Sequence, residues 1–142
     1  MLITMASVVQ LIRSSSLYSG APYAYAATAP AGSRLIFLAG ACPLNADGST
    51  ASVGDYAEQA ARAFENLRTA LGDASASLRD VISTRVLVAS TAREDLTTAW
   101  EVIHEGFGEH DVPSTLLGVT VLGYPDQLVE IEAVAAVPPG HR

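Results

Sequence analysis

The sequence predicts an α+β sandwich in which two helices cover one face of a single mixed β-sheet, with the element order β-β-β-α-β-α-β-β. Two segments, residues 56–71 and 93–109, carry apolar residues three and four positions apart, which is the spacing of one helix face. The other apolar runs are short and bounded by turn residues, as strands are. Three runs precede the first helix, one separates the helices and two end the chain, which favours one sheet with both helices on one face.

The apolar runs in the first third of the chain predict three strands, at residues 8–12, 23–28 and 34–41. Pro30 and Gly32 between the second and third strands suit a hairpin loop. We expect residues 1–7 to be an N-terminal tail and residues 1–142 to form a single domain, since 142 residues suffice to bury one core.

Each helix has a start signal or an apolar stripe. Asp55, with Glu58 three residues later, is typical of a helix N-cap and its box partner. The stripe of the first helix consists of Tyr56, Ala60, Phe64, Leu67 and Leu71, and residues 72–75 mark its end. The stripe of the second consists of Leu96, Ala99, Trp100, Ile103 and Phe107.

The remaining strands are predicted at residues 81–88, 114–122 and 128–137. In the first of these, apolar side chains alternate onto both faces, although two helices can cover only one face of a sheet. The composition agrees, with 49% hydrophobic and only 16% charged residues. We therefore expect the uncovered face to pack against another copy of the chain.

Charge argues against nucleic acid as a partner. The formal net charge is -7 and the isoelectric point about 4.7, whereas phosphate binding requires a basic patch. All eight cationic residues are arginines, and they are scattered along the chain.

Several classes of chemistry are excluded or disfavoured. The chain has no lysine, so Schiff-base chemistry and covalent pyridoxal phosphate cannot occur on it. Glu101 and His104 share a helix face, but no His-Glu-x-x-His motif or phosphate-binding loop is present, and we expect no metal and no cofactor. The single cysteine, Cys42, fits a reducing compartment, and residues 1–10 resemble neither a signal peptide nor a membrane span. We expect a cytoplasmic protein without a membrane partner.

The end of the chain, Pro113-Ser114-Thr115-Leu116-Leu117-Gly118-Val119 followed by Glu130-Ile131-Glu132-Ala133, resembles the C-terminal signature of the RidA/YjgF family. Earlier landmarks agree in order: Pro22-Tyr23, the 35–40 strand that ends in Gly40, Gln59, and Asn66-Leu67. The resemblance spans about residues 12–137. It implies a chorismate-mutase-like fold, a homotrimer with clefts between subunits, and hydrolysis of enamines or imines.

The resemblance also implies site residues. Glu130 stands at the position of the family's water-activating carboxylate, Tyr23 matches a tyrosine that lines the cleft, and Gly40 lies where backbone amides approach the ligand. The residues alone leave alternatives open. The period of two puts Glu130 and Glu132 on one strand face, where they could be two surface glutamates. Tyr23 could be a half-buried strand aromatic.

One landmark differs from the family pattern. Thr115 occupies the position of the arginine that grips a substrate carboxylate, and Leu117 makes the same strand face more apolar. We therefore expect Thr115 and Leu117 to contact a small neutral or hydrophobic metabolite.

Two further residues have an open or minor role. Arg85 either replaces the arginine from a neighbouring strand or forms an ion pair at an interface. Cys42 is expected to be a small, unreactive residue beyond Gly40. The alternative function is a trimer that binds a small molecule, or acts as a chaperone-like partner, without catalysis.

Overall fold

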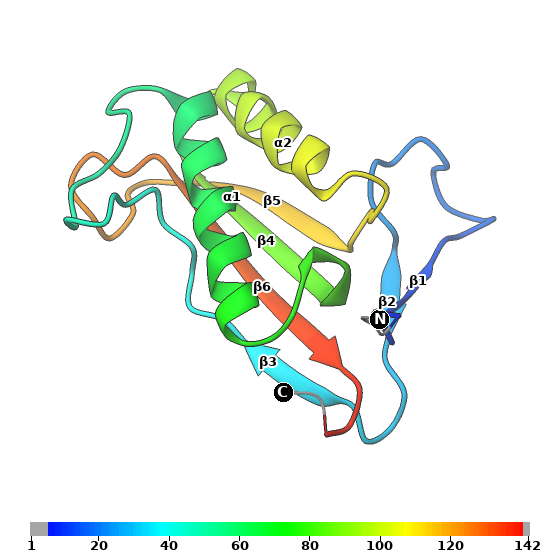
Figure 1. Cartoon of the computed structure of the whole chain (residues 1–142). Coiled ribbons are helices and arrows are strands. Elements are labelled where there is room, and N and C mark those ends of the chain that lie inside the picture. The colour runs from blue at the N-terminus through cyan, green and yellow to red at the C-terminus, as the bar shows by residue number, and fades with distance from the viewer. Residues whose placement is uncertain (1–5, 141–142) are drawn as a thin grey trace.

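The computed structural model describes residues 6–140, and Figure 1 shows how its helices and strands are arranged. The elements in chain order are β1 (Gln10–Ile12), β2 (Ala26–Thr28), β3 (Arg34–Phe37), α1 (Tyr56–Asp73), the 3-10 turn η1 (Leu78–Asp80), β4 (Val81–Ala89), α2 (Arg93–Phe107), β5 (Ser114–Val119) and β6 (Val129–Val137).

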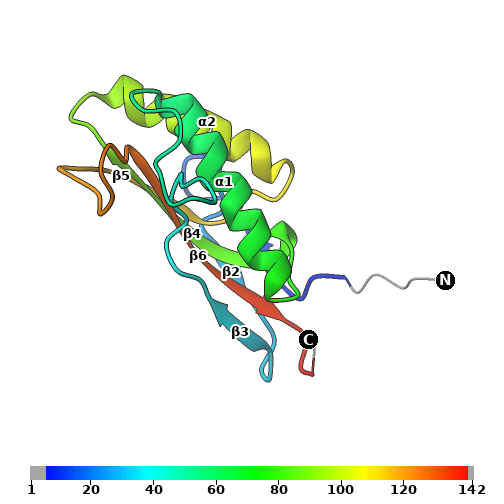
Figure 2. The ribbon, with the colours of Figure 1, turned by 60° about the vertical axis from the view of Figure 1, so that its left-hand side comes forward.

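Four strands form the main sheet, in the order β3-β6-β4-β5. The β4–β5 pair is parallel, and the other two pairs are antiparallel, so the sheet is mixed. Both helices lie on one face of this sheet, as Figure 2 shows from the side. The predicted α+β class, element order and helix placement are confirmed.

The first two strands depart from the predicted single sheet, because β1 and β2 form a separate antiparallel pair. The reason lies in the backbone hydrogen bonds before β2. The Ala24 N–H donates to the Asp111 carbonyl at 2.8 Å, which holds this segment beside the start of β5 and away from β3. The predicted strand at residues 23–28 is correspondingly shortened to Ala26–Thr28.

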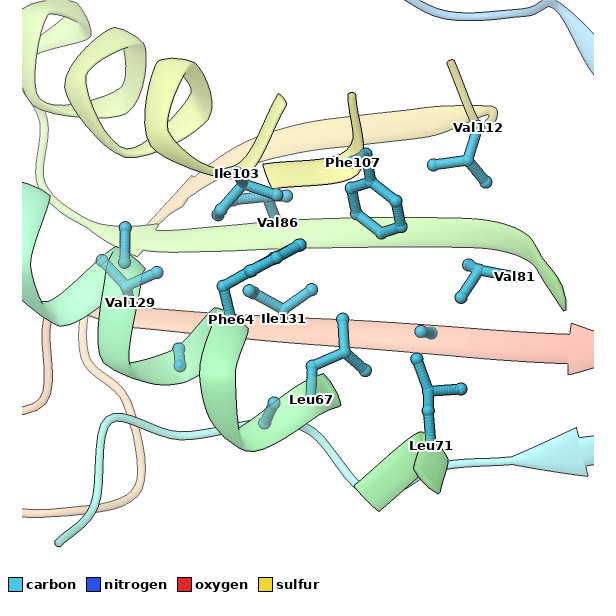
Figure 3. Close-up of a cluster of buried hydrophobic side chains, with 14 of the residues drawn as sticks. Phe64, Leu67, Leu71, Val81, Val86, Ile103, Phe107, Val112, Val129 and Ile131 are labelled. Carbon is cyan, nitrogen blue, oxygen red and sulfur yellow. The ribbon is translucent and has the colours of Figure 1, made fainter. Parts of the chain in front are cut away.

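The core lies between the helices and the sheet, as Figure 3 shows. Phe64, Leu67 and Leu71 of the predicted α1 stripe are at most 5% exposed, and they point towards β4 and β6. Asp55 caps α1 as predicted, because its side chain accepts a hydrogen bond from the Glu58 N–H at 3.0 Å. The α2 stripe buries Ala99, Ile103 and Phe107 in the same core.

The sheet face opposite the helices is not covered by the described part of the chain. Leu35 and Phe37 of β3 are 52% and 76% exposed, and Leu117 of β5 is 37% exposed. The prediction that two helices leave one apolar face open is therefore confirmed. We call this surface the open face.

The expected tail, residues 1–7, falls mostly outside the described residues, which begin at residue 6. Ser7 is in contact with the rest of the chain, because its hydroxyl donates to the Arg79 carbonyl at 2.7 Å. Among residues 6–140, no helix is both long and apolar enough to span a membrane.

Candidate functional site

Glu130 lies on the open face of β6, because the residues on either side of it, Val129 and Ile131, are fully buried on the helix side. Its side chain is half-buried. Its register partner on β4 is Leu87, which is 9% exposed. The carboxylate is thus held at an apolar part of the sheet and keeps access to solvent.

The two oxygens of Glu130 have different surroundings. Oε1 accepts hydrogen bonds from the Cys42 thiol at 3.2 Å and from Gln127 Nε2 at 3.1 Å. Oε2 faces Gly40, since a Cβ placed on that glycine would come within 2.4 Å of it. Within residues 6–140, Oε2 accepts no hydrogen bond, so it is the oxygen left to interact with a ligand or water.

Gly40 reaches this position because the third strand is interrupted. The predicted strand at residues 34–41 forms a ladder only as far as Phe37. The segment then rejoins β6 at Ala41, which exchanges two backbone hydrogen bonds with Ile131, at 2.7 and 3.0 Å. That exchange places Gly40 next to Glu130, so two of the predicted site residues are neighbours in space.

Cys42 was expected to be a small, unreactive residue beyond Gly40, and in the structure its thiol is one of the two hydrogen-bond donors to Glu130. Burial, together with the hydrogen bond to Glu130 and the charge of its carboxylate, raises the pKa of the Cys42 thiol to about 11. The thiol is therefore neutral near pH 7, which makes it a hydrogen-bond donor and a poor nucleophile. The expected lack of reactivity agrees with this environment.

Gln127 was not predicted as a site residue. It is 4% exposed and lies in the turn that leads into β6. The sequence offers only a weak signal for it, a polar residue after a Gly-Tyr-Pro-Asp turn. Its burial and its aim at Glu130 depend on the folded turn.

The open face has two rows of side chains that cross the central strands. In the first row, Glu130 of β6 and Leu117 of β5 lie on either side of Leu87. In the second row, Glu132 and Thr115 lie on either side of Arg85. Leu117 therefore shares a row with Glu130, whereas Thr115 is in the adjacent row.

Arg85 is the cation nearest to position 115 along the sheet, since it is the register partner of Thr115. Its Nη1 lies 3.9 Å from Glu132 Oε1, and both side chains are largely exposed. An exposed ion pair of this length contributes little to stability. Its location on the open face is consistent with the expected interface ion pair.

Tyr23 and Thr115 line a different hollow, at the free edge of β5. This cavity has a volume of about 440 Å³ and is lined by Pro22, Tyr23, Trp100, Ser114, Thr115 and Leu116. Tyr23 packs edge-on against Tyr25, with the ring centroids 5.7 Å apart. Glu130 and Gly40 do not line this cavity, so the predicted site residues form two groups within one chain.

Metal-binding groups are absent from the described residues: no three His, Cys, Asp or Glu side chains in residues 6–140 are grouped to hold an ion. The helical His104 instead approaches Asp111, with 3.3 Å between Nε2 and Oδ1, and Asp111 also pairs with Arg13. These contacts tie α2 to the end of β1.

Comparisons with known proteins give a consistent result. The family model described as Endoribonuclease L-PSP matches residues 14–137. A RutC family protein of Pyrococcus abyssi is 34% identical over 102 residues, which cover 72% of this chain and 78% of that protein. The 3-aminoacrylate deaminase RutC of Acinetobacter baylyi is 31% identical over 117 residues, which cover 82% of this chain and 88% of that one.

Solved structures share the fold. The crystal structure of YyfB from Yersinia pestis, a Rid-family protein of unknown function, has a TM-score of 0.84 at 26% identity and covers 92% of this chain and 99% of that one. A YjgF/YER057c/UK114 family member from Mycobacterium tuberculosis has a TM-score of 0.60 at 32% identity, with 91% and 99% covered. The chain therefore belongs to the RidA/YjgF family and has its chorismate-mutase-like α+β fold.

Proposed function

We propose that this protein is a cofactor-independent hydrolase or tautomerase that acts on a small neutral enamine or imine, with Glu130 as the proton-transferring group. The observation that carries this proposal is the asymmetry of the carboxylate. Oε1 is occupied by two donors, and Oε2 lies beside a residue without a side chain. A general base needs this combination of fixed orientation and a free oxygen.

The reaction follows from that geometry. An enamine becomes an imine when a proton moves from nitrogen to carbon, and Glu130 can carry that proton. Oε2 then takes a proton from a water molecule as the water oxygen attacks the imine carbon. The carboxyl group returns the proton to nitrogen, and the resulting carbinolamine collapses to a carbonyl compound and ammonia. The space beside Gly40 is where the water or the substrate would lie.

Neutral substrates are favoured by the side chains around Glu130. Its row on the open face contains Leu87 and Leu117 and no cation. Loss of one partner from a partly desolvated guanidinium–carboxylate contact costs about 2–5 kcal/mol, whereas the Thr115 hydroxyl offers a neutral hydrogen bond worth about 1 kcal/mol. The likeness to a 3-aminoacrylate deaminase supports enamine chemistry in general.

We also propose that the protein is a homotrimer with its sites in the clefts between subunits. The support is the open face, on which Phe37 is 76% exposed, and the separation of the Tyr23 cavity from Glu130 within one chain. A second copy that places its Tyr23 cavity over Glu130 would complete one cleft, in which Tyr23 orients the ligand.

The acidic charge supports a protein that does not bind nucleic acid, and the free thiol of Cys42 supports a cytoplasmic location.

The test is turnover of a panel of neutral enamines and imines by the wild-type protein and by Glu130→Gln, measured as ammonia release. We expect Glu130→Gln to reduce kcat by about 10²-fold or more, as loss of a general base does. Glu132→Gln is the matched control, because this carboxylate lies on the same strand face but pairs with Arg85. Unchanged turnover in Glu130→Gln would show that the mechanism is wrong.

The second candidate function is a trimer that binds a small molecule without catalysis. Thr115 at the position of the anchoring arginine is the observation that favours it. A thermal-shift screen that finds ligands, none of which is converted, would support binding alone. Product formation from any enamine in the panel would refute it.

Thr115→Arg tests whether the anchor alone separates this chain from members that deaminate 2-imino acids. The substitution should confer ammonia release from 2-aminoacrylate-type imines, because it restores a cation beside Arg85 on the open face. Thr115→Gln is the polar control without charge. If Thr115→Arg gives no such activity, this chain differs from those family members in more than the anchoring arginine.

A further inference from the structure

We infer that Gln127 and Cys42 are positioning residues for Glu130, and that α1 fixes both of them through the side-chain amides of Gln59 and Asn66. The inference rests on the proposed role of Glu130 and says which side chains hold its carboxylate in place. The carboxylate, its two donors and the two supporting amides come from three separate parts of the chain: the Cys42 segment, α1, and β6 with the turn that leads into it.

Gln127 is held so that only one of its amide hydrogens can reach Glu130. Its Oε1 accepts from the Tyr124 N–H at 3.0 Å, and its Nε2 donates both to the Val129 carbonyl and to Glu130 Oε1, each at 3.1 Å. The side chain is 4% exposed, so these partners replace water. The orientation of the amide is thus fixed by the turn around it.

Gln59 fixes that turn from α1. It is fully buried, its Oε1 accepts from the Leu128 N–H at 2.7 Å, and its Nε2 donates to the Asp126 carbonyl at 3.0 Å. These contacts hold the backbone on both sides of Gln127. The position of the first donor is therefore set by a helix on the other face of the sheet.

Asn66 fixes the second donor. Its Nδ2 donates to the carbonyls of Cys42 and Leu44, at 2.8 and 3.0 Å. Asn66 follows Gln59 by seven residues, which is two helical turns, so both amides leave α1 on the same side. The helix thereby holds the Cys42 segment and the turn of Gln127 at once.

Neutral donors suit a site for neutral substrates. A cation at Oε1 would orient the carboxylate, but it would also attract anionic ligands. The thiol and the amide orient Glu130 without adding charge, and the thiol stays protonated because burial and Glu130 raise the pKa of Cys42 to about 11. Both donors point at one oxygen, so the other oxygen remains free.

The test uses variants that remove one donor each: Gln127→Met keeps nearly the same side-chain volume, and Cys42→Ala removes the thiol. Gln127→Met and Cys42→Ala should each lower kcat about tenfold, because a hydrogen bond to a charged group is worth about one factor of ten or more. KM should change by less than about twofold, since neither residue is placed against the substrate. Cys42→Ser keeps a donor and should recover most of the activity lost in Cys42→Ala, which a purely structural role would not predict.

The outcomes separate this inference from the proposed function. If Glu130→Gln abolishes turnover while Gln127→Met and Cys42→Ala keep wild-type kcat, the positioning role is wrong and the function stands. If Glu130→Gln itself is without effect, the proposed function is wrong.

A second readout needs no substrate. Removal of the Glu130 charge should make Cys42 easier to ionise, so alkylation of the thiol by iodoacetamide at pH 9 should be several-fold faster in Glu130→Gln than in the wild type. Equal alkylation rates would show that the thiol does not donate to Glu130, and would overturn the inference.

Discussion

A side chain at position 40 would occupy space that the Glu130 carboxylate now fills. An ideal Cβ on Gly40 would lie 2.4 Å from Oε2 and 2.7 Å from Cδ, both closer than real Cβ contacts allow. The atoms it meets belong to a side chain that can rotate, so the carboxylate would move and the backbone would not. Glycine is required here by close approach and not by backbone conformation.

Gly40→Ala should therefore lower turnover and leave the fold intact. We expect kcat to fall about 10²-fold, because a displacement of about 1 Å at a reacting group can cost that much. The melting temperature should change by only a few degrees. Gly123→Ala is the control, since nothing lies within 4 Å of a Cβ at that position. Wild-type turnover in Gly40→Ala would contradict the placement of Oε2.

The Cys42 thiol predicts how stability depends on pH. The pKa is raised from its usual 9.0 to about 11 in the folded chain, so between these values the unfolded chain loses a proton that the folded chain keeps. The stabilisation is fully present below pH 9 and is lost as the pH rises towards 11. Urea unfolding across this range should show a steeper decline in the free energy of unfolding for the wild type than for Cys42→Ala. Parallel declines would contradict the shift.

At the scale of elements, α1 and α2 are in contact where Gly106 of α2 faces the aromatic ring of Phe64 of α1. A Cβ on Gly106 of α2 would lie 2.5 Å from Phe64 Cε1. Phe64 is 5% exposed and also packs edge-on against Phe107, with ring centroids 5.3 Å apart, so it has no room to move. The close contact of the two helices thus depends on the absence of a side chain at position 106.

Two glycine substitutions should have opposite effects on stability. Gly106→Ala should lower the free energy of unfolding by about 1–3 kcal/mol, because it overpacks the core against Phe64. Gly72→Ala, in the last turn of α1, meets nothing within 4 Å and should raise it by about 0.5–1 kcal/mol, the difference in helix propensity. Chemical denaturation measures both. A stabilising Gly106→Ala would show that the helices do not pack in this way.

The elements also show how far the sequence pattern could predict the structure. The helical stripes were predictable because a spacing of three and four residues is a local signal, and their buried residues agree with it. The separation of β1 and β2 from the main sheet could not be predicted, because it depends on a hydrogen bond between Ala24 and Asp111. Strand pairing joins residues that are far apart in the chain.

At the scale of the whole molecule, the open face is the surface that we propose for assembly. Leu35 and Phe37 at one edge and Leu117 at the other are exposed apolar side chains on the same side of the sheet. Exposed apolar surface of this kind marks an interaction site. In the homotrimer that we propose, this face is buried and the Tyr23 cavity of one copy lies near the Glu130 of another.

Phe37→Glu should disrupt this assembly. The wild type is expected to have three times the 14.8 kDa mass of one chain by light scattering, and the variant should shift towards the single-chain mass because a buried, unpaired charge is costly. Val53→Glu is the control, since Val53 is 63% exposed but lies in the loop before α1. A wild type with the mass of one chain would refute the trimer.

The sequence by itself determined the two helices and the shared strand face of Glu130 and Glu132, because each depends on residues near one another in the chain. It predicted the mixed sheet and the family from the order of elements and landmarks along about residues 12–137. It also predicted Gly40 as a site residue, and the structure has this glycine beside the Glu130 carboxylate. The tertiary structure alone decided that Cys42, 88 residues from Glu130, donates to its carboxylate, and that Gln127 does so from a buried turn. These contacts depend on the pairing of Ala41 with Ile131 and on the amides of α1, which no local pattern encodes.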